Sequence, residues 1–123
     1  MRLALTVLPS AFAICRLPFD ALVPAWVRGE WLSITRTADE LSIVCEQDRV
    51  PANVQADPDW RCLKVQGPLD LSLIGILAAL TAPLAQARIG LFAVSTYGTD
   101  YLLVKEINLD QAMRVLRETG FEI

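Results

Sequence analysis

The chain has 123 residues, of which 54% are apolar, 11 are basic and 14 are acidic, and it contains no histidine. The absence of histidine excludes Ser/His and Cys/His nucleophile pairs, histidine general bases and histidine-containing zinc sites. The net charge of −3 and the scattered single arginines and lysines argue against a nucleic-acid partner, because phosphate binding needs a clustered basic face.

The first half of the chain has the pattern of short strands separated by turn residues. Apolar and β-branched runs predict strands over residues 3–8, 12–17, 32–37 and 41–46. A short helix is expected over about residues 21–28, and a turn-rich stretch runs from Pro51 to Asp59. The segment Met1–Ala13 loosely mimics a signal peptide, but it has one basic residue and Pro9 interrupts its apolar run, so we expect no cleaved leader.

The second half predicts a complete small module. A strand is expected over about residues 60–66, a helix from Leu71 to about Ala87 with Asp70 or Ser72 as its cap, and a hairpin with strands over 89–96 and 101–105. Asn108 caps a second helix that Gly120 ends, and residues 121–123 form a short last strand. The order β-α-β-β-α-β is typical of a ferredoxin-like unit with helices on one face of an antiparallel sheet.

The two halves repeat each other. The strands predicted over 32–37 and 41–46 correspond to those over 89–96 and 101–105, whereas the first half has only a shortened first helix and no second one. We therefore predict an α+β fold of two fused ferredoxin-like modules with antiparallel sheets, residues 1–58 and 59–123, the first of them degenerate. Each module alone has a marginal core, because about 60 residues bury too little surface.

Two compositional features bear on location and assembly. The uncharged stretch Leu71–Ala87 is shorter than the ~20 residues that span a bilayer and contains Pro83, so we expect a buried helix and no membrane association. Because this stretch is apolar almost all round, we also expect a homodimer. Cys15, Cys45 and Cys62 are odd in number and lack a C-x-x-C spacing. They predict buried, reduced thiols in a cytoplasmic protein.

Two stretches could bind a ligand. In the first, Val65–Ser72, Gly67 lies between a strand and a helix, where backbone amides favour an anion such as a carboxylate; the alternative is a plain turn. In the second, Ser95–Tyr101, Asp100 could face an ammonium or guanidinium group; the alternative is a solvated turn. This turn is expected at the opposite end of the strands from Gly67 only if both hairpin strands run full length. A bulge or a strand-edge position would bring Ser95 and Thr96 toward a neighbouring module's loop.

The sequences of residues 67–85 and 89–105 resemble the ACT domain. Within that family, these residues resemble the small two-module bacterial ACT proteins that are similar to the eukaryotic arginine sensors of the CASTOR type. ACT domains are regulatory modules that bind small ligands, usually amino acids, between paired domains. The resemblance implies a ligand-binding site made of Gly67, Pro68, Leu69, Asp70, Thr96, Tyr97, Thr99 and Asp100.

The expected function is therefore non-catalytic binding of an amino acid or similar small ligand, without a cofactor or metal, reported through self-association or a regulated protein partner. Val65-Gln66-Gly67 is similar to the phosphate loop of acylphosphatases, but Leu71 stands where that chemistry needs an arginine, so no enzyme is expected. The alternative is a structural or interaction module that has kept the ACT fold and lost its ligand.

Overall fold

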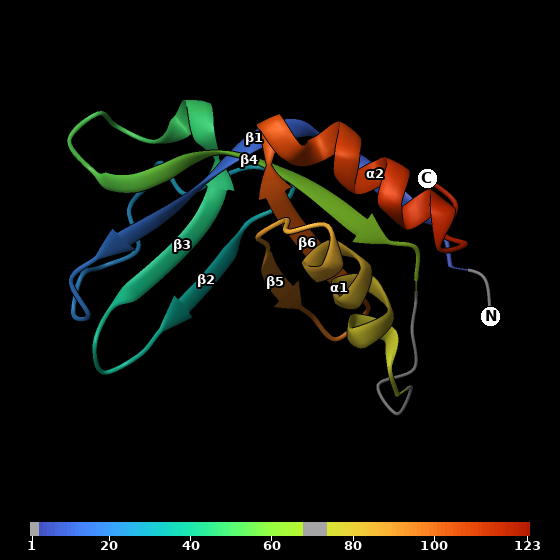
Figure 1. Cartoon of the computed structure of the whole chain (residues 1–123). Helices are drawn as coiled ribbons and strands as arrows, with labels where there is room; N and C mark the ends of the chain where they lie inside the picture. The colour runs from blue at the N-terminus through green and yellow to red at the C-terminus, as the bar shows by residue number, and fades with distance from the viewer. Residues whose placement is uncertain (1–2, 68–73) are drawn as a thin grey trace. The chain divides into compact units, whose positions relative to one another are not determined.

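The computed structural model describes residues 3–67 and 74–123, and the chain divides into two compact units. The helical unit comprises Met1–Pro9 with Arg61–Ile123, and the strand unit comprises Ser10–Trp60. Two long strands, β1 (Leu5–Leu17) and β4 (Gln55–Val65), each contribute residues to both units (Figure 1). Antiparallel strand pairing and two α-helices in the described ranges confirm an α+β fold.

In the strand unit, β1 is flanked by β3 (Leu41–Glu46), which in turn pairs with β2 (Ser33–Arg36). Both pairings are antiparallel, with Ile14 opposite Val44 and Ile34 opposite Ile43. Because side chains alternate along a strand, one face collects a buried cluster of Ala13, Cys15, Leu41, Ile43 and Cys45. Side chains from the loops before β2 and before β4 pack against this cluster.

The loop before β2 corrects one prediction. Residues 21–28 form turns rather than the expected helix. The amide of Ala21 donates to the carbonyl of Pro18 (3.0 Å), and that of Val27 donates to the carbonyl of Pro24 (3.2 Å). Pro24 lacks an amide hydrogen and disfavours helical backbone at the residue before it, so a helix cannot run through this segment.

The start of β4 corrects a second prediction, because the strand begins at Gln55, inside the stretch expected to be turn. After the short 3-10 helix η1 (Gln47–Arg49), only residues 52–54 form turns and bends before the strand. The turn-like residue Asp59 is kept within β4 at φ 68°, a left-handed conformation that Asp tolerates. Its amide donates to Gln47 Oε1 (2.6 Å) and its carboxylate accepts from Gln47 Nε2 (3.1 Å). The module boundary after residue 58 stays a prediction.

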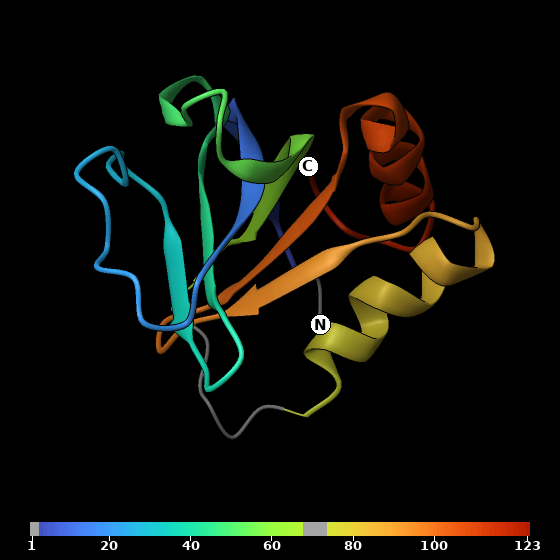
Figure 2. The same cartoon turned by 90° about the vertical axis from the view of Figure 1, so that its left-hand side faces the viewer.

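In the helical unit, the strands follow the order β1-β4-β6-β5, with β5 (Phe92–Ser95) and β6 (Asp100–Lys105) joined as the predicted antiparallel hairpin. The helices α1 (Ile76–Gln86) and α2 (Leu109–Glu118), the latter preceded by the 3-10 helix η2 (Glu106–Asn108), contact each other (Figure 2). Both contribute to one buried cluster: Leu5, Leu63, Val65, Leu80, Leu84, Ile89, Leu102, Val104, Ala112 and Leu116.

The ends of these elements differ in part from prediction. Asn108 and Gly120 flank α2 as expected, although the Asn108 side chain makes no capping hydrogen bond. Helix α1 begins at Ile76, directly after Gly75, whose φ of 88° is incompatible with a right-handed helix. Residues 71–73 of the expected helix lie outside the described residues. The proposed caps Asp70 and Ser72 lie outside the described residues. The last strand is reduced to one parallel bridge between residues 4 and 122.

The first strand is also simpler than expected. A single strand, β1, spans the region where two strands were predicted, and Pro9 lies within it at the residue where the chain passes from the helical unit to the strand unit.

All three cysteines are buried free thiols, as predicted. Cys15 and Cys45 lie on neighbouring strands and hydrogen-bond each other, which lowers the pKa of Cys15 and, together with burial, raises the pKa of Cys45. Burial alone raises the pKa of Cys62 to about 12. These thiols therefore act as small apolar core residues.

Candidate functional site

The β5–β6 turn is closed by a set of short hydrogen bonds between two threonines. The Thr96 amide donates to the Thr99 carbonyl at 2.9 Å, and the Thr96 hydroxyl donates to the same carbonyl at 3.1 Å. The Thr99 amide donates back to the Thr96 hydroxyl at 3.3 Å. A hydroxyl that bonds backbone two to three residues away stabilises a tight turn, so this loop has a defined shape.

Thr99 connects this turn to the end of β4. Its side chain is 7% exposed, and its hydroxyl donates to the Val65 carbonyl at 2.7 Å. Gly67 follows Val65 by two residues and lies exposed in a bend. The opposite-end placement was expected only for hairpin strands of full length, and β5 has four residues. The turn and the Gly67 loop lie at the same end of the sheet. The reason is topological, because β6 neighbours β4 and begins where β4 ends.

The carboxylate of Asp100 is oriented by its neighbour across the hairpin. Ser95 and Asp100 are register partners, and the Ser95 hydroxyl donates to Asp100 Oδ1 at 2.7 Å. The side chain is half-buried at the first residue of β6. An oriented carboxylate of this kind can accept further hydrogen bonds from an ammonium or guanidinium group.

The predicted site residues fall into three groups. Gly67, Thr96, Thr99 and Asp100 lie on the two loops that the Thr99 hydroxyl joins. Tyr97 is at the tip of the turn and is 87% exposed, so its ring is available to a partner or a ligand but has no defined contact. The other predicted residues lie outside the described part of the chain: Pro68, Leu69 and Asp70.

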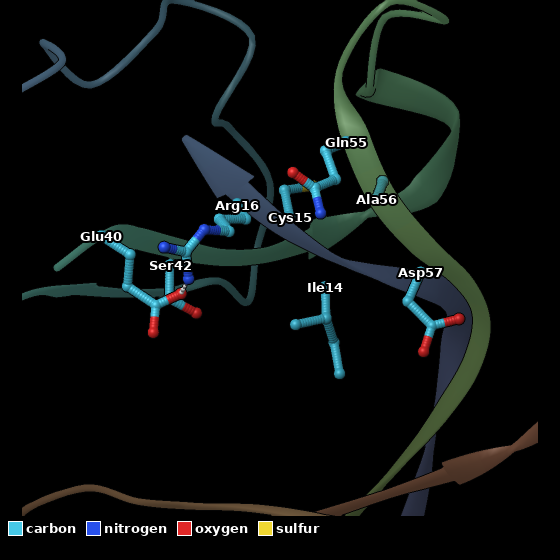
Figure 3. A pocket seen from close by; sticks show the side chains of 8 residues that line it. All are labelled: Ile14, Cys15, Arg16, Glu40, Ser42, Gln55, Ala56 and Asp57. Carbon is cyan, nitrogen blue, oxygen red and sulfur yellow. Dashed lines mark hydrogen bonds and ion pairs between the residues drawn. The ribbon is translucent and has the colours of Figure 1, made fainter. Parts of the chain in front are cut away.

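The strand unit holds a cavity of about 220 Å³ that our sequence reasoning missed (Figure 3). Its walls come from β1, β3, the turn before β3 and the start of β4. The alternation of side chains along β1 and β3 could have indicated it, because Ile14 and Arg16 lie opposite Val44 and Ser42 on one face of the sheet. The register needed to read that signal was decided by the fold.

The described ranges hold neither a metal-binding cluster nor a helix that could span a membrane. Residues 3–67 and 74–123 contain no group of three or more cysteine, aspartate and glutamate side chains placed to hold a metal ion. Within the same ranges, neither α1 nor α2 has the length and apolar character needed to cross a bilayer.

A family model described as the ACT domain matches residues 55–118, more than half of the chain. The chain belongs to the ACT domain family. A second model, of an N-terminal domain, matches residues 10–53, which lie within the strand unit of this ACT protein. The human, bovine and orangutan (Pongo abelii) proteins named cytosolic arginine sensor for mTORC1 subunit 1 are each 36% identical over 59 residues. That match covers 47% of this chain and 18% of those proteins, so the ACT protein spans about a fifth of their length.

Solved structures extend the likeness to nearly the whole chain. A protein from Agrobacterium tumefaciens is 41% identical with a TM-score of 0.93 over 99% of this chain and 92% of that one. The ligand-free regulatory subunit of aspartate kinase from Thermus thermophilus has a TM-score of 0.64 at 10% identity, covering 93% of this chain and 97% of that one. The second likeness shows a shared fold.

Proposed function

We propose that this ACT protein is a regulatory module that binds an amino acid at the loop cluster formed by Gly67 and residues 96–100. Pro68, Leu69 and Asp70, which lie outside the described residues, stay part of the expected site. The observation that carries the proposal is the 2.7 Å hydrogen bond from Thr99 to Val65, which holds the turn beside the strand end that precedes Gly67. Loops held together on a rigid sheet are a common way to build a small-ligand site.

The chemistry of the cluster suits a zwitterion. Backbone amides at a glycine loop favour a carboxylate, and the Asp100 carboxylate, oriented by Ser95, suits an ammonium or guanidinium group. The human relative is named an arginine sensor, and a shared ACT fold relates the chain to the regulatory subunit of an aspartate kinase. These likenesses support a small-molecule regulatory role, and we propose an amino acid as the ligand and no catalytic activity.

The proposal is tested by calorimetry and thermal shift against the twenty amino acids. We expect one of them to bind and to raise the melting temperature, and Gly67→Glu to abolish both effects. Gly90→Glu is the matched control, because Gly90 is exposed and a Cβ added there would meet no atom within 4 Å. No binding by any amino acid at millimolar concentration would contradict the proposal.

The same experiment separates this proposal from the second candidate, a structural module that has kept the ACT fold without a ligand. Such a module would show the same melting temperature with and without every amino acid, in both glycine variants. The exposed Tyr97, 87% accessible at the tip of the turn, favours a contact surface of that kind. A protein partner that binds the wild type and not Tyr97→Ala, in the absence of any amino acid, would support the second candidate.

We further propose that the ACT protein forms a homodimer. Helix α1 carries no charged residue, and its exposed side chains include Ala78, Ala79, Ala82 and Ala85. Small side chains permit close approach of a second helix. We expect a dimer mass by light scattering at micromolar concentration, and a lower mass for Ala82→Glu, which places a charge on the exposed face of α1. A monomer mass for the wild type would contradict this proposal.

A further inference from the structure

Two of the three buried thiols lie next to each other inside the strand unit. Cys45 is opposite Ala13 in the register of β1 and β3, and Cys15 lies two residues further along β1, so the two cysteines are diagonal neighbours on adjacent strands. Both side chains lie on the face that carries the buried cluster, and they are 1% and 0% exposed. Because Ala13 is small, the Cys45 thiol has room to reach diagonally toward Cys15.

The hydrogen bond between these thiols makes the two sulfurs unequal. The Cys45 thiol donates to the Cys15 sulfur, which lowers the pKa of Cys15 and, together with burial, raises the pKa of Cys45. The thiolate is the form in which cysteine attacks an electrophile. The pair therefore combines one sulfur that more readily becomes nucleophilic with a second thiol in contact with it.

Cys62 is an internal comparison for this pair. It lies on β4 in the helical unit, is 0% exposed, and has its pKa raised to about 12 by burial. All three cysteines are thus buried, whereas the contact between two thiols belongs to Cys15 and Cys45. Any chemistry that distinguishes these two from Cys62 follows from their contact and not from burial.

We propose that Cys15 and Cys45 form a modification site at which hydrogen peroxide produces an intramolecular disulfide. The Cys15 thiolate attacks one peroxide oxygen, the O–O bond breaks, and a sulfenic acid and hydroxide are formed. The Cys45 thiol gives its proton to that hydroxide, and its sulfur attacks the Cys15 sulfur, so that an S–S bond forms, the S–O bond breaks and a second hydroxide leaves. The proton first lost by Cys15 converts this hydroxide to water. Two thiols and one peroxide thus give one disulfide and two water molecules.

The cavity of the strand unit gives peroxide a way toward β1. Cys15 is among the residues that line this cavity of about 220 Å³ (Figure 3), which is several times the volume of about 30 Å³ that one water molecule takes up in the liquid. Because Cys15 is only 1% exposed, the reaction also needs a local opening of the strand unit. The two sulfurs must then move from hydrogen-bond contact to a bond length of about 2.05 Å.

The disulfide joins β1 to β3 and closes a loop from residue 15 to residue 45 that contains all of β2. Closing a loop of about 30 residues removes conformations from the unfolded chain, so the oxidised protein should be the more stable one. This inference goes beyond the proposed function and does not rest on it, because the cysteine pair lies in the strand unit and the loop cluster lies in the helical unit.

The test treats the folded full chain with millimolar hydrogen peroxide, removes the excess with catalase, unfolds the chain and alkylates the remaining thiols with N-ethylmaleimide. The intact mass counts the labels, and peptide mapping locates them. The reduced chain has three free thiols to label. After oxidation we expect a single label, on Cys62, and a Tm raised by at least about 5 °C. Two or three labels, a disulfide that contains Cys62, or one that joins two chains would overturn the proposal.

Two variants and an unfolded control separate pairing from reactivity. Oxidised Cys62→Ala should keep the raised Tm and take no label, whereas Cys45→Ala, which also loses one thiol, should show no rise in Tm on oxidation. Oxidation of the wild type in urea should favour the Cys45–Cys62 disulfide, because those residues enclose the shorter loop of the unfolded chain. An equal yield of the Cys15–Cys45 disulfide from folded and urea-unfolded chains would refute a site made by the fold.

Discussion

Replacing Thr99 with valine tests the contact that joins the hairpin turn to the end of β4. The substitution keeps the β-branched shape and removes the hydroxyl that donates to the Val65 carbonyl at 2.7 Å. Since Thr99 is only 7% exposed, water cannot readily replace the lost donor. A buried acceptor left without its partner costs about 1–3 kcal/mol, so we expect the free energy of unfolding to fall by about 1.5 kcal/mol.

The matched control is Thr119→Val. The Thr119 hydroxyl also donates to a backbone carbonyl, that of Leu116 at 2.9 Å, but Thr119 is exposed at the end of α2. Water can satisfy that carbonyl after the substitution, so we expect a loss below about 0.5 kcal/mol.

Urea unfolding followed by circular dichroism measures both variants, with the slope of the transition as a check on its cooperativity. For a chain of this size, about 1.5 kcal/mol corresponds to a decrease of about 6 °C in melting temperature. Equal stabilities of Thr99→Val and Thr119→Val would refute the reasoning, because burial of the Thr99 hydroxyl would then not raise the cost of losing its hydrogen bond.

Substitutions at Asp59, Gly29 and Cys62, each with a control, test the backbone and the core. Asp59→Ala should lower the free energy of unfolding by about 2 kcal/mol, because alanine has no side-chain oxygen and resists the left-handed conformation at φ 68°. Asp59→Gly should lower it less, because glycine adopts that conformation readily. Thermal melts compare the two variants. Gly29→Ala should lower the free energy of unfolding by about 1–2 kcal/mol, because Gly29 has φ 134° and a Cβ there would lie 2.6 Å from Glu46 Oε2. Gly90→Ala is the control, and its free energy of unfolding should stay within about 0.5 kcal/mol of the wild type because a Cβ at Gly90 meets open space. Burial raises the pKa of Cys62 from 9.0 to about 12 in the folded chain. The folded state therefore favours the neutral thiol, and the stability gained from this is fully present below pH 9 and is lost as the pH rises toward 12. Urea midpoints measured across that range should fall more steeply for the wild type than for Cys62→Ala, and parallel curves would contradict the assignment.

The predictions from sequence were most accurate where one local pattern decides the structure. Leu109, Ala112, Met113 and Leu116 follow the helical period and form α2, and the turn residues before Asp100 form the hairpin. Five of the eight predicted site residues lie in the described part of the chain. Thr96, Thr99 and Gly67 lie on joined loops, whereas residues 68–70 lie outside the described residues.

The incorrect predictions arose where tertiary contacts override local preference. Asp57, Pro58 and Asp59 have the composition of a turn, yet they lie in β4, because the side chain of Gln47 satisfies the left-handed Asp59 from a distant segment. The expected helix over residues 21–28 is a pair of proline-associated turns, which pack apolar side chains on the strand cluster instead.

By itself, the sequence determined the chemistry that this protein lacks and the elements that it contains. The absence of histidine excludes whole classes of site, and hydrophobic periodicity predicts strands and helices, because both depend only on composition and nearest neighbours. Only the tertiary structure decided which loops meet. The bond from Thr99 to Val65 spans 34 residues, and the ion pair of Arg16 with Glu40 spans 24. Contacts of that length are set by strand order and register, which no local pattern encodes.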